Sequence, residues 1–183
     1  MTPHPLVALL YRRRTFILLI SILLILAFSQ PRLSAFVVGV ILCVVGEGIR
    51  IWASGTLRKT RTLTTGGPYA WVRHPLYVGS FFLAMGYCAM SGRWQSYVLG
   101  MPVFFVVHGA AVVVEEQVLL KLYGDEYRAY SARVARFVPR PGAALRGERQ
   151  FALRQAFANR EQMNLLCVLL ITGFFVARLA LGW

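Results

Sequence analysis

The stretch GGPYAWVRHPLYVG concentrates residues that can bind an anion at the start of an apolar helix. Pro75 suits the first helical position, where its missing N–H costs no hydrogen bond. The free N–H groups and the dipole of a helix start attract anions, and Arg73 and His74 stand directly before it. Tyr77 follows in the first turn, and Gly79 allows another group to approach the backbone closely. The stretch therefore predicts a site for a ligand carboxylate or phosphate.

Two adjacent carboxylates, Glu115 and Glu116, end an apolar run in a chain that has only seven acidic residues. Acidic side chains at such a place indicate a polar pocket. Neighbouring helix residues point about 100° apart, so we expect only one of the two to face the pocket squarely, and we favour Glu116. His108 lies on the same stripe and lines this pocket or contacts another helix. The alternative is that these carboxylates, like the basic pair before Pro75, only mark a membrane boundary.

Two pairs of residues spaced by three follow the carboxylates, and each pair shares a helix face. Aromatic rings such as Tyr127 and Tyr130 can flank an adenine, and guanidinium groups such as Arg133 and Arg136 can hold a carboxylate. The alternative is a tyrosine pair in the core and an arginine pair on a solvated face.

Histidine and cysteine give no sign of a metal site or a disulfide. The three histidines lack metal-ligand spacing, and the three cysteines form no CxxC pair and sit in apolar stretches. These residues are His4, His74, His108, Cys43, Cys88 and Cys167. We therefore expect no metal.

Five apolar segments supply the elements that must position these side chains. We expect spanning helices over residues 15–28, 33–53, 75–90, 94–114 and 163–181. With 57% hydrophobic residues, 15% charged residues and a mean hydropathy of +0.59, the composition predicts an all-α integral membrane protein. The 183 residues suit a single membrane domain. A cleaved signal peptide is the alternative for the first segment, although no small-x-small cleavage site follows it.

Two further segments have an amphipathic pattern. The stretch EEQVLLKLYGDEYRAYSARVARF has apolar residues near helical spacing, and Gly124 is expected to break it into two helices. The stretch ERQFALRQAFANREQ leads into the last span. Such helices can lie on the membrane surface, with Arg149, Arg154 and Arg160 near headgroups.

Lysine and arginine are distributed unevenly between the two ends of the expected spans. Three precede the first span, four lie between the second and third, and nine follow the fourth, whereas only Arg32 and Arg93 lie at the other end. By the positive-inside rule, the amino terminus and both long basic segments are cytoplasmic and the carboxyl terminus is outside. The net charge of +13 then reflects topology and attraction to anionic membrane lipids, and we expect no binding of nucleic acid.

In combination, these motifs resemble the isoprenylcysteine carboxyl methyltransferase and phospholipid methyltransferase superfamily. The matching features are an RHPxYxG turn, then EExxL, then GxxYxxY and a basic stretch ending in proline, over residues 66–141. The resemblance implies a cofactor-binding and catalytic region there, with S-adenosylmethionine bound at the cytoplasmic face and a lipophilic or thiol acceptor arriving from the bilayer. The residues that it assigns to cofactor binding are Arg73, His74, Tyr77, Gly79, Tyr127, Tyr130 and Arg136, with Glu116 or Glu115 as the catalytic carboxylate.

The chain departs from the eukaryotic carboxyl methyltransferases at one place. They carry an arginine about one helical turn before the acidic pair, where this chain has Ala111 and Val112. A carboxylate acceptor is therefore in doubt, whereas an amine or thiol would need a carboxylate to accept its proton. Two alternatives remain for the function: a sterol-type membrane reductase that uses a nicotinamide cofactor, and a non-enzymatic membrane protein that binds lipid or a partner.

Overall fold

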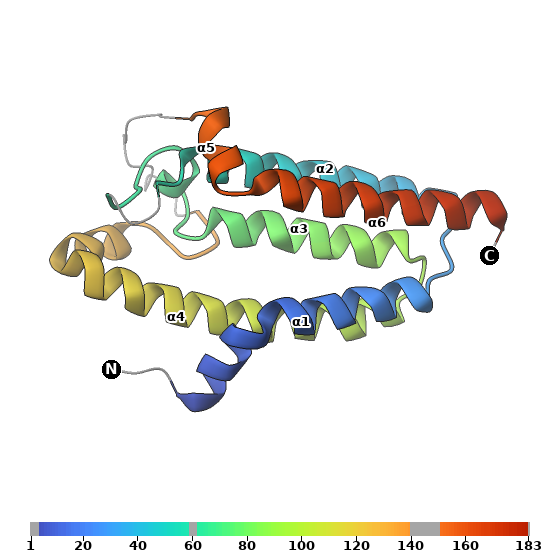
Figure 1. Ribbon diagram of the computed structural model, residues 1–183, viewed down its shortest axis with the longest axis horizontal. Coiled ribbons are helices and arrows are strands. Elements are labelled where there is room, and N and C mark those ends of the chain that lie inside the picture. The colour runs from blue at the N-terminus through green and yellow to red at the C-terminus, as the bar shows by residue number, and fades with distance from the viewer. Residues whose placement is uncertain (1–3, 59–61, 140–150, 183) are drawn as a thin grey trace.

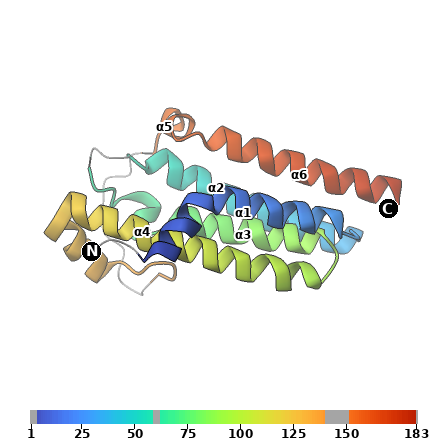
Figure 2. The same cartoon turned by 60° about the horizontal axis from the view of Figure 1, so that its bottom comes forward.

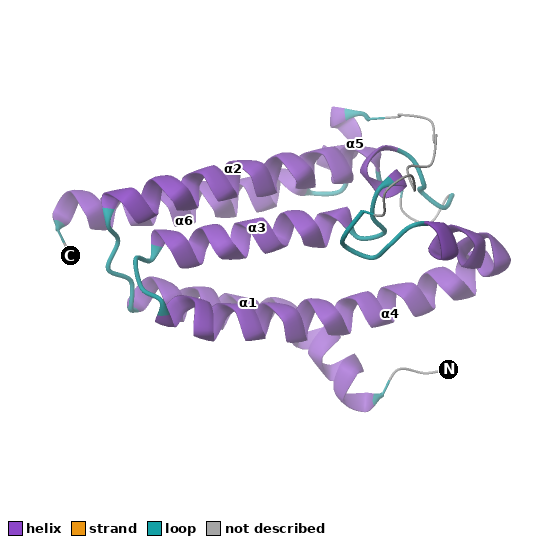
Figure 3. Ribbon diagram, turned by 180° about the vertical axis from the view of Figure 1, so that it is seen from behind, coloured by secondary structure: helices purple, strands orange, loops and turns teal. Residues whose placement is uncertain are grey.

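The computed structural model describes residues 4–58, 62–139 and 151–182. The regular elements among these residues are helices, joined by loops, without a named strand among them (Figure 3). The elements are α1 (Pro5–Ala27), α2 (Leu33–Thr56), the short 3-10 helix η1 (Gly67–Ala70), α3 (Pro75–Met90), α4 (Gln95–Arg133), α5 (Leu153–Ala158) and α6 (Glu161–Leu181). The prediction of an all-α fold is confirmed.

The five long helices run alternately up and down one bundle (Figure 1). Helix α3 packs against α2 on one side and α4 on the other, while α1 lies along α4 and α6 along α2. Both short turns, α1–α2 and α3–α4, lie at the same end as the carboxyl terminus. The opposite end carries η1, α5 and the last turns of α4, so most of the candidate motifs meet there.

Three of these helices, α2, α4 and α6, are long and apolar enough to cross a membrane. Helix α3 is apolar but has only 16 residues. Helix α1 begins at Pro5 rather than at Thr15, because Pro5 suits a first helical position and His4 caps the helix through its side chain. Helix α1 therefore includes Arg12, Arg13 and Arg14, which were expected to precede the first span. The prediction of spanning helices is confirmed for three segments, and the count of five stays a prediction.

Glycines allow α2 and α3 to approach each other closely. A Cβ atom on Gly46 would lie 2.7 Å from the Gly79 carbonyl oxygen, and one on Gly86 would lie 2.8 Å from that of Gly39. The close approach predicted at Gly79 is therefore made by a neighbouring helix. The structure explains Gly79 by helix packing, and its part in cofactor binding stays a prediction.

Helix α4 extends well beyond its expected end at residue 114. Its long axis kinks at Gly124, whose φ of 50° and ψ of −119° are not helical, and this confirms the predicted break. The second amphipathic segment is shorter than expected: α5 has six residues, and the left-handed Arg160 (φ 62°) separates it from α6. The expected positions of Arg149 and of Pro141, the end of the proposed catalytic region, lie outside the described residues.

Candidate functional site

The turn before α3 is joined to the chain that follows α4. The Arg73 N–H donates to the Ala135 carbonyl oxygen at 2.8 Å, and the His74 N–H donates to that of Arg136 at 3.1 Å. Val72 and Ala135 form an isolated parallel bridge. The kink at Gly124 helps the chain to return in this way. Two motifs about sixty positions apart in the sequence therefore lie side by side.

Glu116 is at the centre of the resulting polar cluster. Its Oε1 lies 3.0 Å from Nη1 of Arg73 and 3.3 Å from Nε2 of His74. The guanidinium of Arg136 donates to both carboxylate oxygens, from Nε at 3.0 Å and from Nη2 at 2.7 Å. The Glu116 side chain is only 13% exposed. Three basic side chains from two segments thus share one carboxylate.

This cluster keeps Glu116 ionised. The residue lies beyond the apolar part of α4, which ends at Val114. Burial acts to raise the pKa of Glu116, but hydrogen bonds from His74 and Arg136 and the charge of Arg73 outweigh it and lower the pKa to about 2. A carboxyl group with so low a pKa is a poor proton acceptor near neutral pH.

The two predicted tyrosines belong to the same cluster. Tyr127 and Tyr130 are both buried, with ring centroids 6.2 Å apart. The Tyr127 hydroxyl lies 3.5 Å from Nη1 of Arg73, and the Tyr130 hydroxyl donates to the Tyr69 carbonyl oxygen at 2.8 Å. These contacts fix η1 and the following turn against the end of α4.

Glu115 faces a different set of groups. Its Oε1 accepts a hydrogen bond from the Tyr77 hydroxyl at 2.5 Å and lies 3.9 Å from Nη1 of Arg14. The Tyr77 ring meets the His108 ring edge-on, with centroids 5.1 Å apart. The Glu115 side chain is 38% exposed. Both carboxylates of the pair therefore have partners on the α3 side, although through different surfaces of α4.

A cavity of about 770 Å³ lies inside the bundle beside this cluster. Apolar side chains of α1, α3, α4 and α6 form most of its walls, among them Ile22, Leu83, Phe104 and Ile171. Its volume is typical of a site for a small molecule. The predicted residues that line it are Arg73, His74, Tyr77 and Glu115, together with His108.

The cavity also has polar lining residues that were not predicted as site residues. Arg50 donates to Glu161 from Nε at 2.8 Å and from Nη2 at 3.3 Å, and its Nη1 donates to the Ser80 hydroxyl at 2.6 Å. Asn164 donates to Glu47 at 2.6 Å. A signal was present, because Glu47 and Arg50 are charged residues within an apolar segment.

The structure thus sorts the predicted residues into three groups. Arg73, His74, Tyr77 and Glu115 line the cavity. The remaining members of the cluster, Glu116, Tyr127, Tyr130 and Arg136, hold that wall from behind through the contacts above. Gly79 packs against α2 instead.

The profile of the phospholipid methyltransferase family matches residues 34–126, just over half of the chain. The chain belongs to the phospholipid methyltransferase family. The match covers α2, α3 and α4 as far as the residues just after the kink, and therefore includes both carboxylates and Tyr77.

Relatives of this family member include named enzymes. The protein-S-isoprenylcysteine O-methyltransferase of Schizosaccharomyces pombe is 36% identical over 81 residues, which cover 44% of this chain and 34% of that protein. The cobalt-zinc-cadmium resistance protein CzcN of Cupriavidus metallidurans is 32% identical over 114 residues, 61% of this chain and 51% of that protein. Methanethiol S-methyltransferase 1 of Bradyrhizobium diazoefficiens is 35% identical over 71 residues, 39% of this chain and 24% of that protein.

The chain spans about half or less of the length of these relatives. No solved structure matches it. Family membership and the three apolar helices identify an integral membrane protein. The comparisons lend no support to the sterol-type reductase as an alternative.

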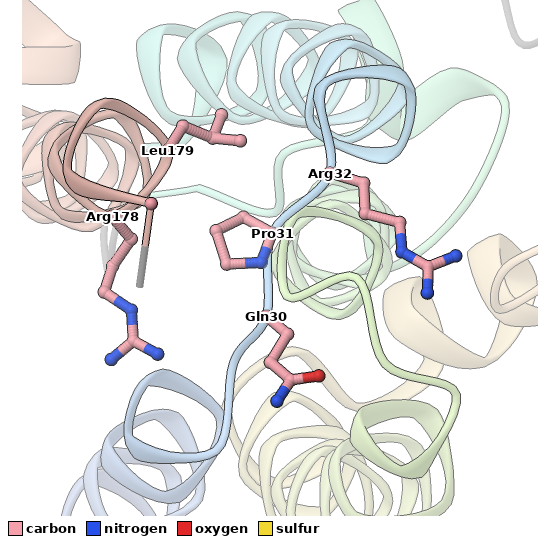
Figure 4. Close-up of a pocket in the computed structure, with 6 residues that line it drawn as sticks. Gln30, Pro31, Arg32, Arg178 and Leu179 are labelled. Atoms are coloured by element: carbon pink, nitrogen blue, oxygen red, sulfur yellow. The ribbon is translucent and has the colours of Figure 1, made fainter.

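A smaller cavity of the protein, of about 370 Å³, lies at the other end of the helix bundle. It is formed by the α1–α2 turn and the end of α6, with Gln30, Pro31, Arg32, Arg178 and Leu179 in its lining (Figure 4). The Arg32 and Arg178 side chains point away from each other in this view, so they do not converge on one ligand. It contains none of the predicted site residues.

The acidic, histidine and cysteine side chains within residues 4–58, 62–139 and 151–182 do not gather into any group of three that could hold a metal ion. The absence of a metal stays a prediction.

Proposed function

We propose that the protein is an integral-membrane methyltransferase that uses S-adenosylmethionine and acts on a lipid-like or small thiol or carboxyl acceptor. The observation that carries the proposal is the meeting of the RHPxYxG turn and the acidic pair at one wall of an apolar cavity. The named methyltransferases among the relatives support the reaction class. By the distribution of basic residues, this end of the bundle would face the cytoplasm, where the donor is available.

The wall formed by Arg73 and His74 fits the donor's charged end. Arg73 lines the cavity, and its Nε is buried and has no hydrogen-bond partner within the described part of the chain. A buried N–H of a guanidinium that lacks a partner is costly, so a ligand oxygen is its natural complement. We propose that Arg73, His74 and Tyr77 contact the donor, while Tyr127, Tyr130 and Arg136 support them.

Glu116 would then act as a positioning residue. Its carboxylate is held by Arg73, His74 and Arg136, and its low pKa keeps it charged. By fixing the direction of Arg73 and His74, it would shape the donor site without exchanging protons.

Glu115 is the better candidate for a proton acceptor. It lines the cavity, contacts Tyr77, and is exposed enough to release a proton to water. With a thiol or amine acceptor, the proton leaves sulfur or nitrogen for the Glu115 carboxylate, directly or through the Tyr77 hydroxyl. The freed electron pair then forms the bond to the methyl carbon as the carbon–sulfur bond to the donor breaks. Alignment and exclusion of water supply the rest of the catalysis.

The side of the cavity formed by α4 offers a carboxylate acceptor no cationic partner. Ala111, one of the two positions compared with the arginine of the carboxyl methyltransferases, lines the cavity and is fully buried. This part of α4 therefore offers an acceptor no positive charge. Apolar walls from four helices suit a lipid-like molecule or a small apolar thiol.

The test is a titration of the purified protein with S-adenosylhomocysteine and, separately, with reduced nicotinamide dinucleotide. We expect binding of the first only. A labelled-methyl transfer assay across lipid extracts and small thiols then identifies the acceptor. Binding of the nicotinamide alone would reject the proposal, and binding of neither, in a folded sample, would favour a non-enzymatic protein.

A further inference from the structure

The wall of the cavity that faces α2 and α6 has its own set of polar side chains. Arg50, Tyr69, Ser80 and Asn164 line this wall, and they come from α2, η1, α3 and α6. Tyr69 lies in the stretch GGPYAWVRHPLYVG, but neither it nor the other three was predicted as a site residue. A buried polar group destabilises the fold unless it has a hydrogen-bond partner. A donor on this wall without a partner in the protein therefore indicates contact with a ligand.

Most donors of this wall are occupied within the protein. Arg50 donates to Glu161 and to Ser80, and the Ser80 hydroxyl donates to the Leu76 carbonyl oxygen at 3.0 Å. The Asn164 amide donates to Glu47. These contacts hold α6 against α2 and α3, and they explain why the three side chains are there.

Tyr69 is the exception. Its side chain is 7% exposed, and its buried hydroxyl has no hydrogen-bond partner within residues 4–58, 62–139 and 151–182. The residue is nevertheless fixed firmly, because its carbonyl oxygen accepts the Tyr130 hydroxyl at 2.8 Å. A phenylalanine would fill the same space without an unsatisfied group. A rigid, buried hydroxyl that lines a cavity is therefore placed to meet something in that cavity.

We propose that the Tyr69 hydroxyl donates a hydrogen bond to an oxygen of the ligand held in this cavity, making the wall beside Arg50 a subsite for a carboxylate, phosphate or carbonyl oxygen. This inference rests on the proposed function. The Tyr69 hydroxyl is a hydrogen-bond donor without an acceptor in the described part of the protein, so the ligand must supply the acceptor atom. The guanidinium of Arg50 on the same wall is already paired with the Glu161 carboxylate, so the Tyr69 hydroxyl is the donor that remains for a charged or a neutral ligand oxygen.

Two molecules could bring such an oxygen, and they are separable by experiment. The donor has a carboxylate at its amino-acid end, and a lipid acceptor has phosphate or carbonyl oxygens. If the donor is the source, Tyr69→Phe weakens binding of S-adenosylhomocysteine by about 5- to 30-fold, the size of one hydrogen bond to a ligand. If the acceptor is the source, binding of S-adenosylhomocysteine is unchanged and the KM for the acceptor rises by a similar factor.

The matched control is Tyr97→Phe. Tyr97 lies in the first turns of α4, packs against the hydrophobic core and does not line this cavity. We expect its variant to keep wild-type affinity and KM. The ligand-free Tyr69→Phe protein should melt at the wild-type temperature or above it, because no internal hydrogen bond is lost.

Two results would overturn the inference. A lower melting temperature of ligand-free Tyr69→Phe would show that the hydroxyl is bonded within the protein. Unchanged affinity and unchanged acceptor KM in a folded variant would show that no ligand oxygen meets it. Failure of the proposed function would look different, because the wild-type and Tyr97→Phe proteins would then also fail to bind S-adenosylhomocysteine.

Discussion

Glu115 and Glu116 are neighbours in the chain, yet they have different surroundings because a helix turns its successive side chains about 100° apart. Glu116 points to the segment after α4 and gains Arg73, His74 and Arg136 as partners. Glu115 points to the cavity and gains Tyr77. We expected one carboxylate to face a pocket and favoured Glu116, whereas Glu115 is the one that lines the cavity. That expectation did not include the return of the chain after Gly124, which gives Glu116 its partners.

The first prediction concerns Glu116→Gln. The amide keeps the shape but removes the charge that three basic side chains share, so we expect a loss of about 1–3 kcal/mol in the free energy of unfolding. Arg136 should contribute least to this loss, because its side chain is half exposed. Donor affinity should fall as well, since Arg73 and His74 lose their anchor. The measurements are thermal or denaturant unfolding in detergent and titration with S-adenosylhomocysteine.

Glu126→Gln is the matched control, because Glu126 is exposed on the same helix. We expect it to unfold like the wild type.

The contribution of Glu116 to the free energy of unfolding should also depend on pH, and it should fall as the pH falls. Its pKa lies below the ordinary value of 4.5, so its contribution is present above pH 4.5 and is lost as the pH falls to about 2. The stability difference between wild type and Glu116→Gln should therefore shrink over this window. A constant difference would contradict the assignment.

The second prediction concerns Glu115→Gln. If Glu115 accepts the proton of a thiol or amine, its amide should lower the rate of methyl transfer by about 10²–10⁴. Stability should change by less than about 1 kcal/mol, because the side chain is 38% exposed and its ion pair with Arg14 is long. Labelled-methyl transfer and unfolding are measured on the same preparation. Full activity in a folded variant would leave the acidic pair without a role in proton transfer.

For single residues, the sequence indicated which side chains belong to the candidate site, but it did not indicate which side chains they contact. Local patterns located Arg73, His74, Tyr77 and the acidic pair, because each lies at one end of an apolar segment of the sequence. The Arg50–Glu161 pair joins residues 111 positions apart. No local pattern can specify a contact of that separation, although the placement of Arg50 in an apolar segment indicated that it needed a partner.

Among the elements, α3 determines where the site lies. It starts at Pro75 directly after the site turn and packs on α2 through paired glycines. The spacing of seven between Gly39 and Gly46, and between Gly79 and Gly86, places each pair on one helix face. Small residues at such an interface let two backbones approach, as in many membrane helix pairs.

The third prediction is that Gly46→Ala destabilises the bundle. The added Cβ would lie 2.7 Å from the Gly79 carbonyl oxygen and 3.0 Å from the Leu83 nitrogen, so the helices must move apart. Overpacking of this kind costs about 1–3 kcal/mol. The measurement is the melting temperature in detergent, together with S-adenosylhomocysteine affinity, because a shift of α3 also shifts His74.

The control for this variant is Gly109→Ala in α4. A Cβ there meets nothing within 4 Å, so the change should be neutral or slightly stabilising through helix propensity. Equal effects of the two substitutions would mean that α2 and α3 are not packed as closely as the structure has them.

The apolar runs of the sequence predicted the bounds of α3 and the central part of α2 well. The expected bounds 75–90 are those of α3, and the expected span 33–53 lies within α2. The ends of α1 and α4 were wrong, because helices continue beyond their apolar segments when polar residues still favour helix. Apolar length predicts a spanning segment and does not predict where the helix stops.

The whole molecule has two chemically different ends. One end carries the turn motif, the acidic pair and most of the lysines and arginines within the described residues, while the other carries two short turns with few charges. In Figure 2, turned from the first view, the same segments still lie at opposite ends of the bundle. The alternating directions of the five long helices produce this separation, and the positive-inside rule relates it to the two sides of a membrane.

The last prediction is the orientation of the bundle. Single cysteines at Trp94 and Val138, which are 70% and 76% exposed, report on the two ends. They are introduced in a background without Cys43, Cys88 and Cys167, the native thiols. A membrane-impermeant maleimide should label the cysteine at 138 in inverted vesicles and the cysteine at 94 in right-side-out vesicles, because the end that includes residue 138 is the basic one. Labelling of both from one side would contradict the bundle as a spanning unit, and the reverse pattern would place the donor site on the side where S-adenosylmethionine is scarce.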